Sequence, residues 1–332
     1  MNSTLPTRMA RRALGFASFL VVAFASAVCC AESNQGAEPA APLVPVRMAN
    51  LAIGWGPQEL AIERGTFARH GIDLQVINFI RGGAEATAGV ASGQVDMGEF
   101  GSPILMGIAS GLHIKIVGSP PVKGNNFEVI GAKGIGSIMD LRGKVVAGGE
   151  LGGGSHQSLL KILHDNGLSE NDVTVVATGG LNAEMVLRSG RVAAAVTSEL
   201  TRLKMIDDGR ATLLARARDY YGHYQHGYIF ATDDFIRTHP EAVREFLQAK
   251  REAFEYAKTH LDELIDFTGS RVKVRKDIIR AYYAEQIPQW DLTLSVDLEG
   301  VANAVKILQE LHEIKPTVKF DPNTWLDLRF LD

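Results

Sequence analysis

The chain has 332 residues, of which 34 are Lys or Arg, 38 are Asp or Glu, and two are Cys. This weakly acidic chain lacks the clustered cations that neutralise phosphates, which excludes a nucleic-acid-binding protein. A chain of this length buries a large hydrophobic core and usually divides into two domains.

The first residues have the order of a secretory signal peptide. Arg8, Arg11 and Arg12 precede an apolar run over 13–28, and small residues follow it. The run is short for a membrane span. We therefore predict a signal peptide over 1–31, a linker over 32–44 and a mature protein in the periplasm. A retained N-terminal anchor is the alternative, and the Arg11-Arg12 pair leaves both Sec and twin-arginine export open.

Both cysteines, Cys29 and Cys30, lie at the end of the predicted signal peptide. A mature chain that begins at Glu32 has no cysteine and therefore needs neither a disulfide nor thiolate chemistry. Loss of three of the 34 basic residues leaves 31 against 38 acidic ones, a formal charge of −7. Lipidation at Cys29 or Cys30 is the alternative to a soluble product, but Val28 stands where lipoprotein signals have a small residue.

Short β-branched segments alternate with helical ones, which predicts mostly parallel sheets with helices on both faces. The predicted strands cover 46–53, 72–79, 95–97, 113–118, 127–132, 144–147, 173–177, 192–196 and 226–231. The predicted helices begin at Pro57 and cover 84–91, 101–110, 155–167 and 183–188, followed by a helical tail from 238 with segments at 278–283 and 298–311.

The order of strands and helices repeats after about a hundred residues, as in a duplicated lobe. In the clearest match, Ser92-Gly93-Gln94-Val95-Asp96 aligns with Ser189-Gly190-Arg191-Val192-Ala193. Breaker-rich segments at 119–126 and 218–225 read as crossovers. We therefore predict an α/β fold of two doubly wound lobes joined by two crossovers. The predicted lobes are 45–121 plus 226–332 and 122–225, with the C-terminal helices packed on the first.

Several motifs resemble those of the solute-binding proteins for aliphatic sulfonates, taurine, nitrate and thiamine precursors. They are Gly56-Pro57 with Ala61, Gly65 and Phe67, then 91–96, 140–146, 189–193 and 235–243. The resemblance covers nearly the whole mature chain. It implies a type II periplasmic-binding fold and a subunit of an ABC importer that closes on a small molecule and delivers it to a membrane permease. It also implies a monomer with no cofactor and no catalytic activity.

In open α/β sheets, ligands bind beyond the carboxyl ends of the strands, where the N–H groups of helix starts point outward. Four such junctions occur here, at 54–57, 101–102, 152–156 and 197–199. Because helix starts carry partial positive charge, we expect a small anionic ligand, sulfonate-like or carboxylate-like. The candidate ligand-binding residues are Trp55, Gly56, Arg81, Gly101, Ser102, Gly154, Ser155, His156, Asn182, Thr197, Glu199 and His226.

Each candidate has a chemical reason and an ordinary structural alternative. Trp55 can stack on a planar ligand, and Arg81 can pair with an anionic head group. Ser102 and Ser155 can donate hydroxyl hydrogen bonds. The alternatives are a tryptophan that caps the lobe, a solvated arginine, and common turn or cap residues. Glu199 matches a Trp-Glu-Pro-like family position, but its two neighbours differ, which leaves its role open.

Other kinds of site fit the sequence poorly. The glycine loop at 148–155 has no Lys before its Ser and lacks the G-x-G-x-x-G spacing, so neither nucleotide pattern is present. His223 and His226 are three residues apart in an extended segment, which points their side chains to opposite faces and argues against a shared metal. Two alternatives remain: an enzyme on the same fold, of the thiamine-pyrimidine-synthase or menaquinone-pathway type, and a subunit that presents ligand to a membrane sensor.

Overall fold

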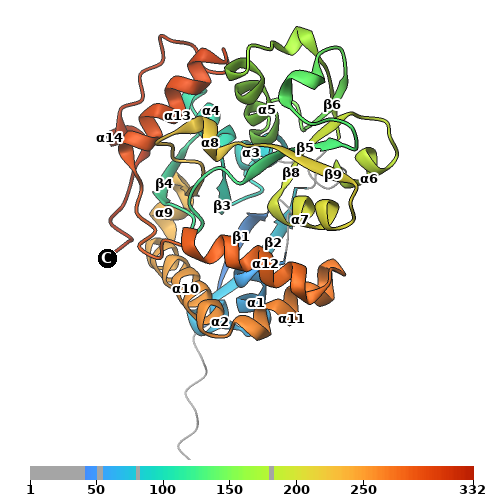
Figure 1. The fold of residues 1–332 in the computed structure, drawn as a ribbon. Coiled ribbons are helices and arrows are strands. Elements are labelled where there is room, and N and C mark those ends of the chain that lie inside the picture. The colour runs from blue at the N-terminus through green and yellow to red at the C-terminus, as the bar shows by residue number, and fades with distance from the viewer. Residues whose placement is uncertain (1–41, 51–54, 80–82, 179–182) are drawn as a thin grey trace, which may run out of the picture. The chain divides into compact units, whose positions relative to one another are not determined.

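Two five-stranded sheets organise the computed structural model, which describes residues 42–50, 55–79, 83–178 and 183–332 (Figure 1). The first sheet has the order β2 (Ile72–Asn78), β1 (Val44–Asn50), β3 (Met97–Phe100), β10 (Tyr228–Thr232) and β4 (Ile114–Gly118). The second has the order β7 (Thr174–Ala177), β6 (Val145–Gly149), β8 (Ala194–Ser198), β5 (Phe127–Ala132) and β9 (Ala211–Arg216).

The two sheets have the same design. In the first, β1 lies parallel to β2 and β3, while β10 is antiparallel to β3 and β4. In the second, β6 lies parallel to β7 and β8, while β5 is antiparallel to β8 and β9. The first sheet therefore receives β10 from beyond its own run of the chain, whereas the second is built from five consecutive strands. The predicted α/β fold with a repeated strand order is confirmed.

Helices join the strands of each sheet. Those of the first sheet are α1 (Pro57–Glu63), α2 (Thr66–Arg69), α3 (Gly83–Ala91) and α4 (Pro103–Ala109). Those of the second are α5 (Gly154–Asp165), α6 (Ala183–Arg188), α7 (Glu199–Asp207) and α8 (Arg218–Tyr221). The tail contains α9 (Asp233–Thr238), α10 (Pro240–Thr259), α11 (Leu261–Val272), α12 (Lys276–Gln286), α13 (Leu298–Glu310) and α14 (Pro322–Trp325). In the described ranges, no helix has the length and apolar character that crossing a membrane requires.

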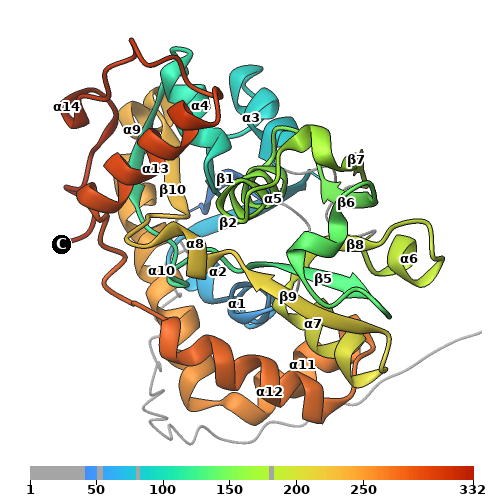
Figure 2. The same ribbon diagram turned by 45° about the horizontal axis from the view of Figure 1, so that its top comes forward.

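The first sheet buries a core on each face. On one face, Val243 and Phe246 of α10 pack with Val46 of β1, as expected from the helical spacing of the apolar residues in α10. On the other face, Phe100 and Phe230 lie with ring centroids 5.1 Å apart. The prediction that C-terminal helices pack on the first sheet is therefore confirmed for α10. Figures 1 and 2 also show α12 beside α7, a helix of the second sheet.

Several predicted bounds were wrong. β3 and β8 each end later than predicted, at Phe100 and Ser198, because pairing with the antiparallel strands β10 and β5 extends them into residues that resemble turn formers. The strand predicted over 46–53 ends at Asn50 in the described residues, and 51–54 lie outside them. α7, β9 and α11 were not predicted, and the segment predicted as a simple crossover at 218–225 contains α8. α5 begins at Gly154, one residue earlier than predicted.

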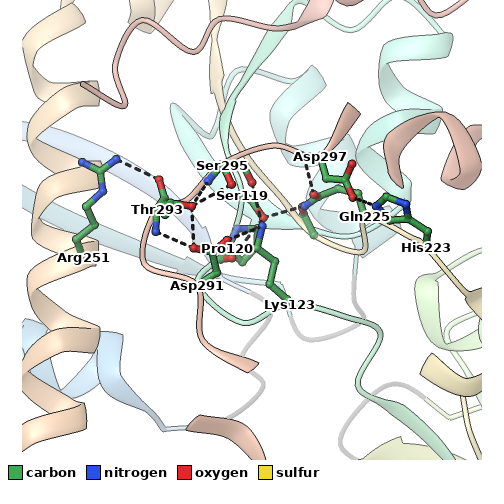
Figure 3. A network of polar contacts seen from close by, with 11 residues as sticks. Ser119, Pro120, Lys123, His223, Gln225, Arg251, Asp291, Thr293, Ser295 and Asp297 are labelled. Carbon is green, nitrogen blue, oxygen red and sulfur yellow. Dashed lines mark hydrogen bonds and ion pairs between the residues drawn. The ribbon is translucent and has the colours of Figure 1, made fainter. Parts of the chain in front are cut away.

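Two connections between the sheets run beside a third segment of the chain. Ser119 and Gln225, one from each connection, are joined by a 2.8 Å hydrogen bond from Gln225 Nε2 to Ser119 Oγ. The segment 289–297 bonds to both connections: Asp291 N donates to Pro121 O at 2.7 Å, and Asp297 N donates to Gln225 Oε1 at 3.2 Å (Figure 3). A tail segment thus ties the two connections into one unit.

Candidate functional site

The β3–α4 and β6–α5 junctions, one from each sheet, meet in the structure. Ser102 Oγ, which is buried, donates a hydrogen bond to Gln157 Oε1 on α5. A Cβ atom on Gly101 would lie 3.2 Å from the backbone oxygen of His226. A Cβ atom on Gly154 would lie 3.3 Å from the Phe127 ring. Glycine permits this close packing, and we call Gly101, Ser102, Gly154, Gln157 and His226 the junction cluster.

Aromatic rings surround His226 in this cluster. The Phe127 ring meets it edge-on with centroids 5.7 Å apart, and the Tyr224 ring lies at 6.1 Å. His226 Nδ1 is buried and has no hydrogen-bond partner in the described structure. Burial lowers the pKa of His226 to about 4, so the imidazole is neutral at pH 7. The cluster therefore contains a neutral imidazole with an unpaired ring nitrogen.

Ser155 and His156 belong to the same junction but face their own loop. A Cβ atom on Gly149 would lie 2.1 Å from Ser155 Oγ, so the serine folds back over the end of β6. His156 is buried, and its Nδ1 accepts a 3.2 Å hydrogen bond from Gly152 N. The first-turn N–H groups of α5 have no acceptor within the helix and remain available for an anion.

Trp55 and Gly56 border a separate cavity of about 120 Å³. Trp55 is 45% exposed, and its ring meets Phe267 edge-on at 6.3 Å and lies 5.5 Å from the Arg271 guanidinium. Gly56 N donates a 2.9 Å hydrogen bond to the Glu59 carboxylate. Aromatic side chains line much of this cavity, and Leu200 of α7 is the lining residue that comes from a helix of the second sheet. Its further lining residues include Phe254, Tyr282, Tyr283, Gln286 and Trp290.

Thr197 and Glu199 are held by partners outside the junction cluster. Thr197 is buried on β8 and is paired in register with Glu128 of β5. Glu199, at the first position of α7, is 1% exposed and contacts Arg218 and Gln286. Carboxylates already stand at the start of α7 and at the start of α1, so these two of the four predicted junctions are poorly suited to an anion. Arg81 and Asn182 lie outside the described residues.

Sequence reasoning missed a buried ion pair near the ends of β1 and β3. Lys250 of α10 is 2% exposed, pairs with Glu99, and donates a 2.8 Å hydrogen bond to Gln58 Oε1. These residues and Asn50 line a cavity of about 240 Å³. Lys250 lies four residues after Phe246 and four before Phe254, on the apolar stripe of α10. A lysine within the apolar stripe of a helix indicates in the sequence a buried cation that needs a partner of opposite charge.

A larger and more apolar groove of about 660 Å³ runs between α3 and α4. Small residues form most of its walls, and Gly152 of the β6–α5 junction closes one end. The groove thus adjoins the junction cluster and can hold the apolar body of an organic molecule. Its other lining residues include Ala84, Thr87, Ala88, Pro103, Met106 and Gly107. Within the described ranges, no three His, Cys, Asp or Glu side chains are placed to hold a metal ion.

The sequence of the chain is similar to a known protein family and to named relatives. The model of the family described as NMT1/THI5 like matches residues 57–264. A Brucella abortus protein named as a binding protein is 28% identical over 238 residues, which cover 70% of this chain and 73% of the relative.

Two solved structures have the same fold. The alkanesulfonate-binding protein SsuA from Xanthomonas axonopodis pv. citri, bound to MOPS, superposes with a TM-score of 0.72 at 18% identity, covering 87% of this chain and 100% of that protein. The periplasmic aliphatic sulphonate binding protein SsuA from Escherichia coli gives a TM-score of 0.67 at 18% identity, covering 82% and 89%. The type II periplasmic-binding fold expected from the sequence is therefore confirmed.

Proposed function

Because the chain belongs to the NMT1/THI5-like family, we propose that it is the exported solute-binding subunit of an ABC importer. The observation that carries this proposal is the junction cluster, in which Ser102 from the first sheet meets Gln157 from the second. A molecule held there touches both sheets only when they are close together, so its binding favours closure. The closed protein then delivers the molecule to a membrane permease.

The proposed moving parts are two lobes, 45–121 plus 226–332 and 122–225. The hydrogen bond between Gln225 and Ser119 joins the two connections on which such lobes would turn. Binding by lobe closure needs no reaction, and we propose that the protein is a monomer without a cofactor that releases its ligand unchanged. Periplasmic location follows from the proposed signal peptide over 1–31 and agrees with the names of the similar SsuA structures.

The proposed ligand is a small organic anion with a sulfonate or carboxylate group. The first turn of α5 supplies N–H donors for the anionic group, beside the Ser102 hydroxyl, whose hydrogen is donated to Gln157. The groove between α3 and α4 provides an apolar surface next to these donors. Of the predicted contacts, Gly101, Gly154, Ser155 and His226 lie nearest to this arrangement. Trp55 and Gly56 are proposed to contribute through their own cavity.

A thermal-shift panel on residues 32–332 tests this function. The panel should contain alkanesulfonates, aromatic carboxylates, nitrate, and uncharged and cationic analogues of the same size. A ligand at one hundred times its dissociation constant adds about 2.7 kcal/mol to stability. We expect stabilisation by organic anions and recovery of the compound unchanged by mass spectrometry. A response confined to neutral or cationic compounds would reject the ligand class, and conversion of the compound would reject the binding role.

A further inference from the structure

Helices α7 and α12 form a polar contact between the second sheet's helices and the C-terminal helices. Gln286 Nε2 of α12 donates to the Glu199 carboxylate of α7. Arg202 of α7 donates to Glu285 of α12 at 2.5 Å. At the far end of the contact, Arg275 Nη1 lies 2.8 Å from Asp207 Oδ2. Both overall views show the two helices side by side (Figures 1 and 2).

The same polar side chains also bond within the second sheet's own unit. Glu199 pairs with Arg218 of α8, and Arg202 donates to Glu128 of β5 at 2.7 Å. Glu128 also accepts from Arg216 of β9 at 3.1 Å. Separation of α7 from α12 therefore breaks the bonds to Gln286, Glu285 and Arg275 and leaves the bonds within the second sheet's own unit in place. The contact can open without dismantling either side.

Opening of the contact exposes the buried carboxyl group of Glu199 to water. In the contact its carboxyl group is buried, and burial raises its pKa to about 7, outweighing the favourable charge of Arg218. Water reaches the group when α12 moves away, and its pKa then falls towards the ordinary value of a glutamate. The charged and titratable groups that face it come from α7, α8, α12, β5 and β9. They are Arg202, Arg218, Tyr282, Glu285, Glu128 and Arg216.

We propose that the α7–α12 contact is a latch that holds the two lobes closed and that its closure takes up a proton on Glu199. This inference rests on the proposed function, because only a protein that opens and closes needs a latch. The cavity bordered by Trp55 lies beneath the latch, since Leu200 and Gln286 line it. Closure of the latch therefore also encloses that cavity.

The sign of the pH effect follows from the two states of Glu199. The closed form retains the proton up to about pH 7, whereas the open form releases it near the ordinary glutamate range of about 4.3. Between these values closure takes up one proton, so each unit of acidification favours the closed form by up to about tenfold. Above pH 7 the response disappears, because both forms are then ionised.

The distance between the two helices provides a test that needs no ligand. Residues 32–332 contain no cysteine, so Ile206→Cys on α7 and Ala284→Cys on α12 introduce two labelling sites at exposed positions. Pulsed electron spin resonance on spin labels at these sites measures their separation from pH 5.5 to 8. We expect the short-distance fraction to grow as the pH falls.

Three variants separate the latch from general acid effects. Glu199→Gln, which imitates the protonated group, should give a short distance that no longer depends on pH. Glu285→Ala should lower the short fraction but keep its pH response, because Glu199 remains. Glu255→Gln, at an exposed position of α10, should behave as the parent. A pH-independent distance in the parent, or an unchanged response in Glu199→Gln, would overturn the proposal. Failure to find any solute, with this response intact, would instead count against the transport function alone.

Discussion

Ser102 Oγ donates a hydrogen bond to Gln157 Oε1, which joins the junction after β3 to the first turns of α5. Both side chains are buried, and Gln157 Nε2 also donates to Gly152 O at 3.2 Å. A hydroxyl on the first sheet's unit thus orients an amide on the second, beside the donors proposed to hold an anion. This hydrogen bond connects the two halves of the candidate site, the β3–α4 junction and the β6–α5 junction.

Ser102→Ala should therefore lower the free energy of unfolding by about 1 to 2 kcal/mol, because it leaves a buried amide oxygen without its donor. Urea denaturation measures this change. In a double-mutant cycle, Gln157→Ala should cost less in the Ser102→Ala background than in the parent. Strictly additive effects would show that the two side chains do not interact in solution.

His226→Gln should reduce the sensitivity of the protein to acid. The pKa of His226 is depressed to about 4 from an ordinary value near 6.5, so its contribution is complete above about pH 6.5 and is lost as the pH falls towards 4. The shift corresponds to a loss of about 3 kcal/mol as an upper bound. Urea denaturation at pH 7 and at pH 4.5 measures how much unfolding free energy the parent and the variant each lose on acidification. An equal loss in both proteins would mean that His226 is not buried in neutral form.

Trp55→Ala should weaken binding of the best compound in the thermal-shift panel by roughly 1 to 3 kcal/mol if the indole stacks on it. Isothermal calorimetry measures the loss. Trp325→Phe is the matched control, since Trp325 lies in the core of the first sheet and borders none of the three cavities described above. Full affinity in Trp55→Ala would assign the indole to the contact with Phe267 and Arg271 alone.

Lys250→Met should destabilise the protein by about 3 kcal/mol, because it leaves Glu99 partly buried without its cation. The double variant Lys250→Met with Glu99→Gln should recover much of that loss, since no unpaired charge then remains. Chemical denaturation at pH 7 compares the three proteins. No recovery in the double variant would indicate that Lys250 stabilises the core through packing of its aliphatic chain.

Ser155→Ala should cost about 1 to 3 kcal/mol in ligand affinity if its hydroxyl completes the anion site, whereas Arg81→Ala should cost little if helix N–H groups dominate. Because Ser155 Oγ packs against Gly149, removal of the hydroxyl can change the stability of the protein as well as its affinity for the ligand. Calorimetry on both variants, together with their unfolding curves, separates lost affinity from lost stability. A large loss in Arg81→Ala would transfer the main role to the arginine.

The sequence by itself determined the alternation of strands and helices, the repeat and the family resemblance. These features depend on local periodicity and on short turn motifs such as Gly56-Pro57, which the chain displays without reference to distant residues. It also indicated Gly101, Ser102 and Gly154, because the ends of parallel strands meet at one edge of a sheet, and His226, because it follows a predicted crossover between the lobes. Four of the twelve candidate residues were thus brought together by topology that the pattern already implied.

Only the tertiary structure decided which polar groups are already paired. Glu59 occupies the N–H of Gly56, and Glu199 is buried against Gln286, a residue 87 positions along the chain. Lys250 and Glu99 likewise meet across almost half of the chain. Burial and pairing of a charge depend on neighbours that are remote in sequence, and no local pattern encodes them. The same remoteness explains why the α7–α12 contact became visible only in the folded protein.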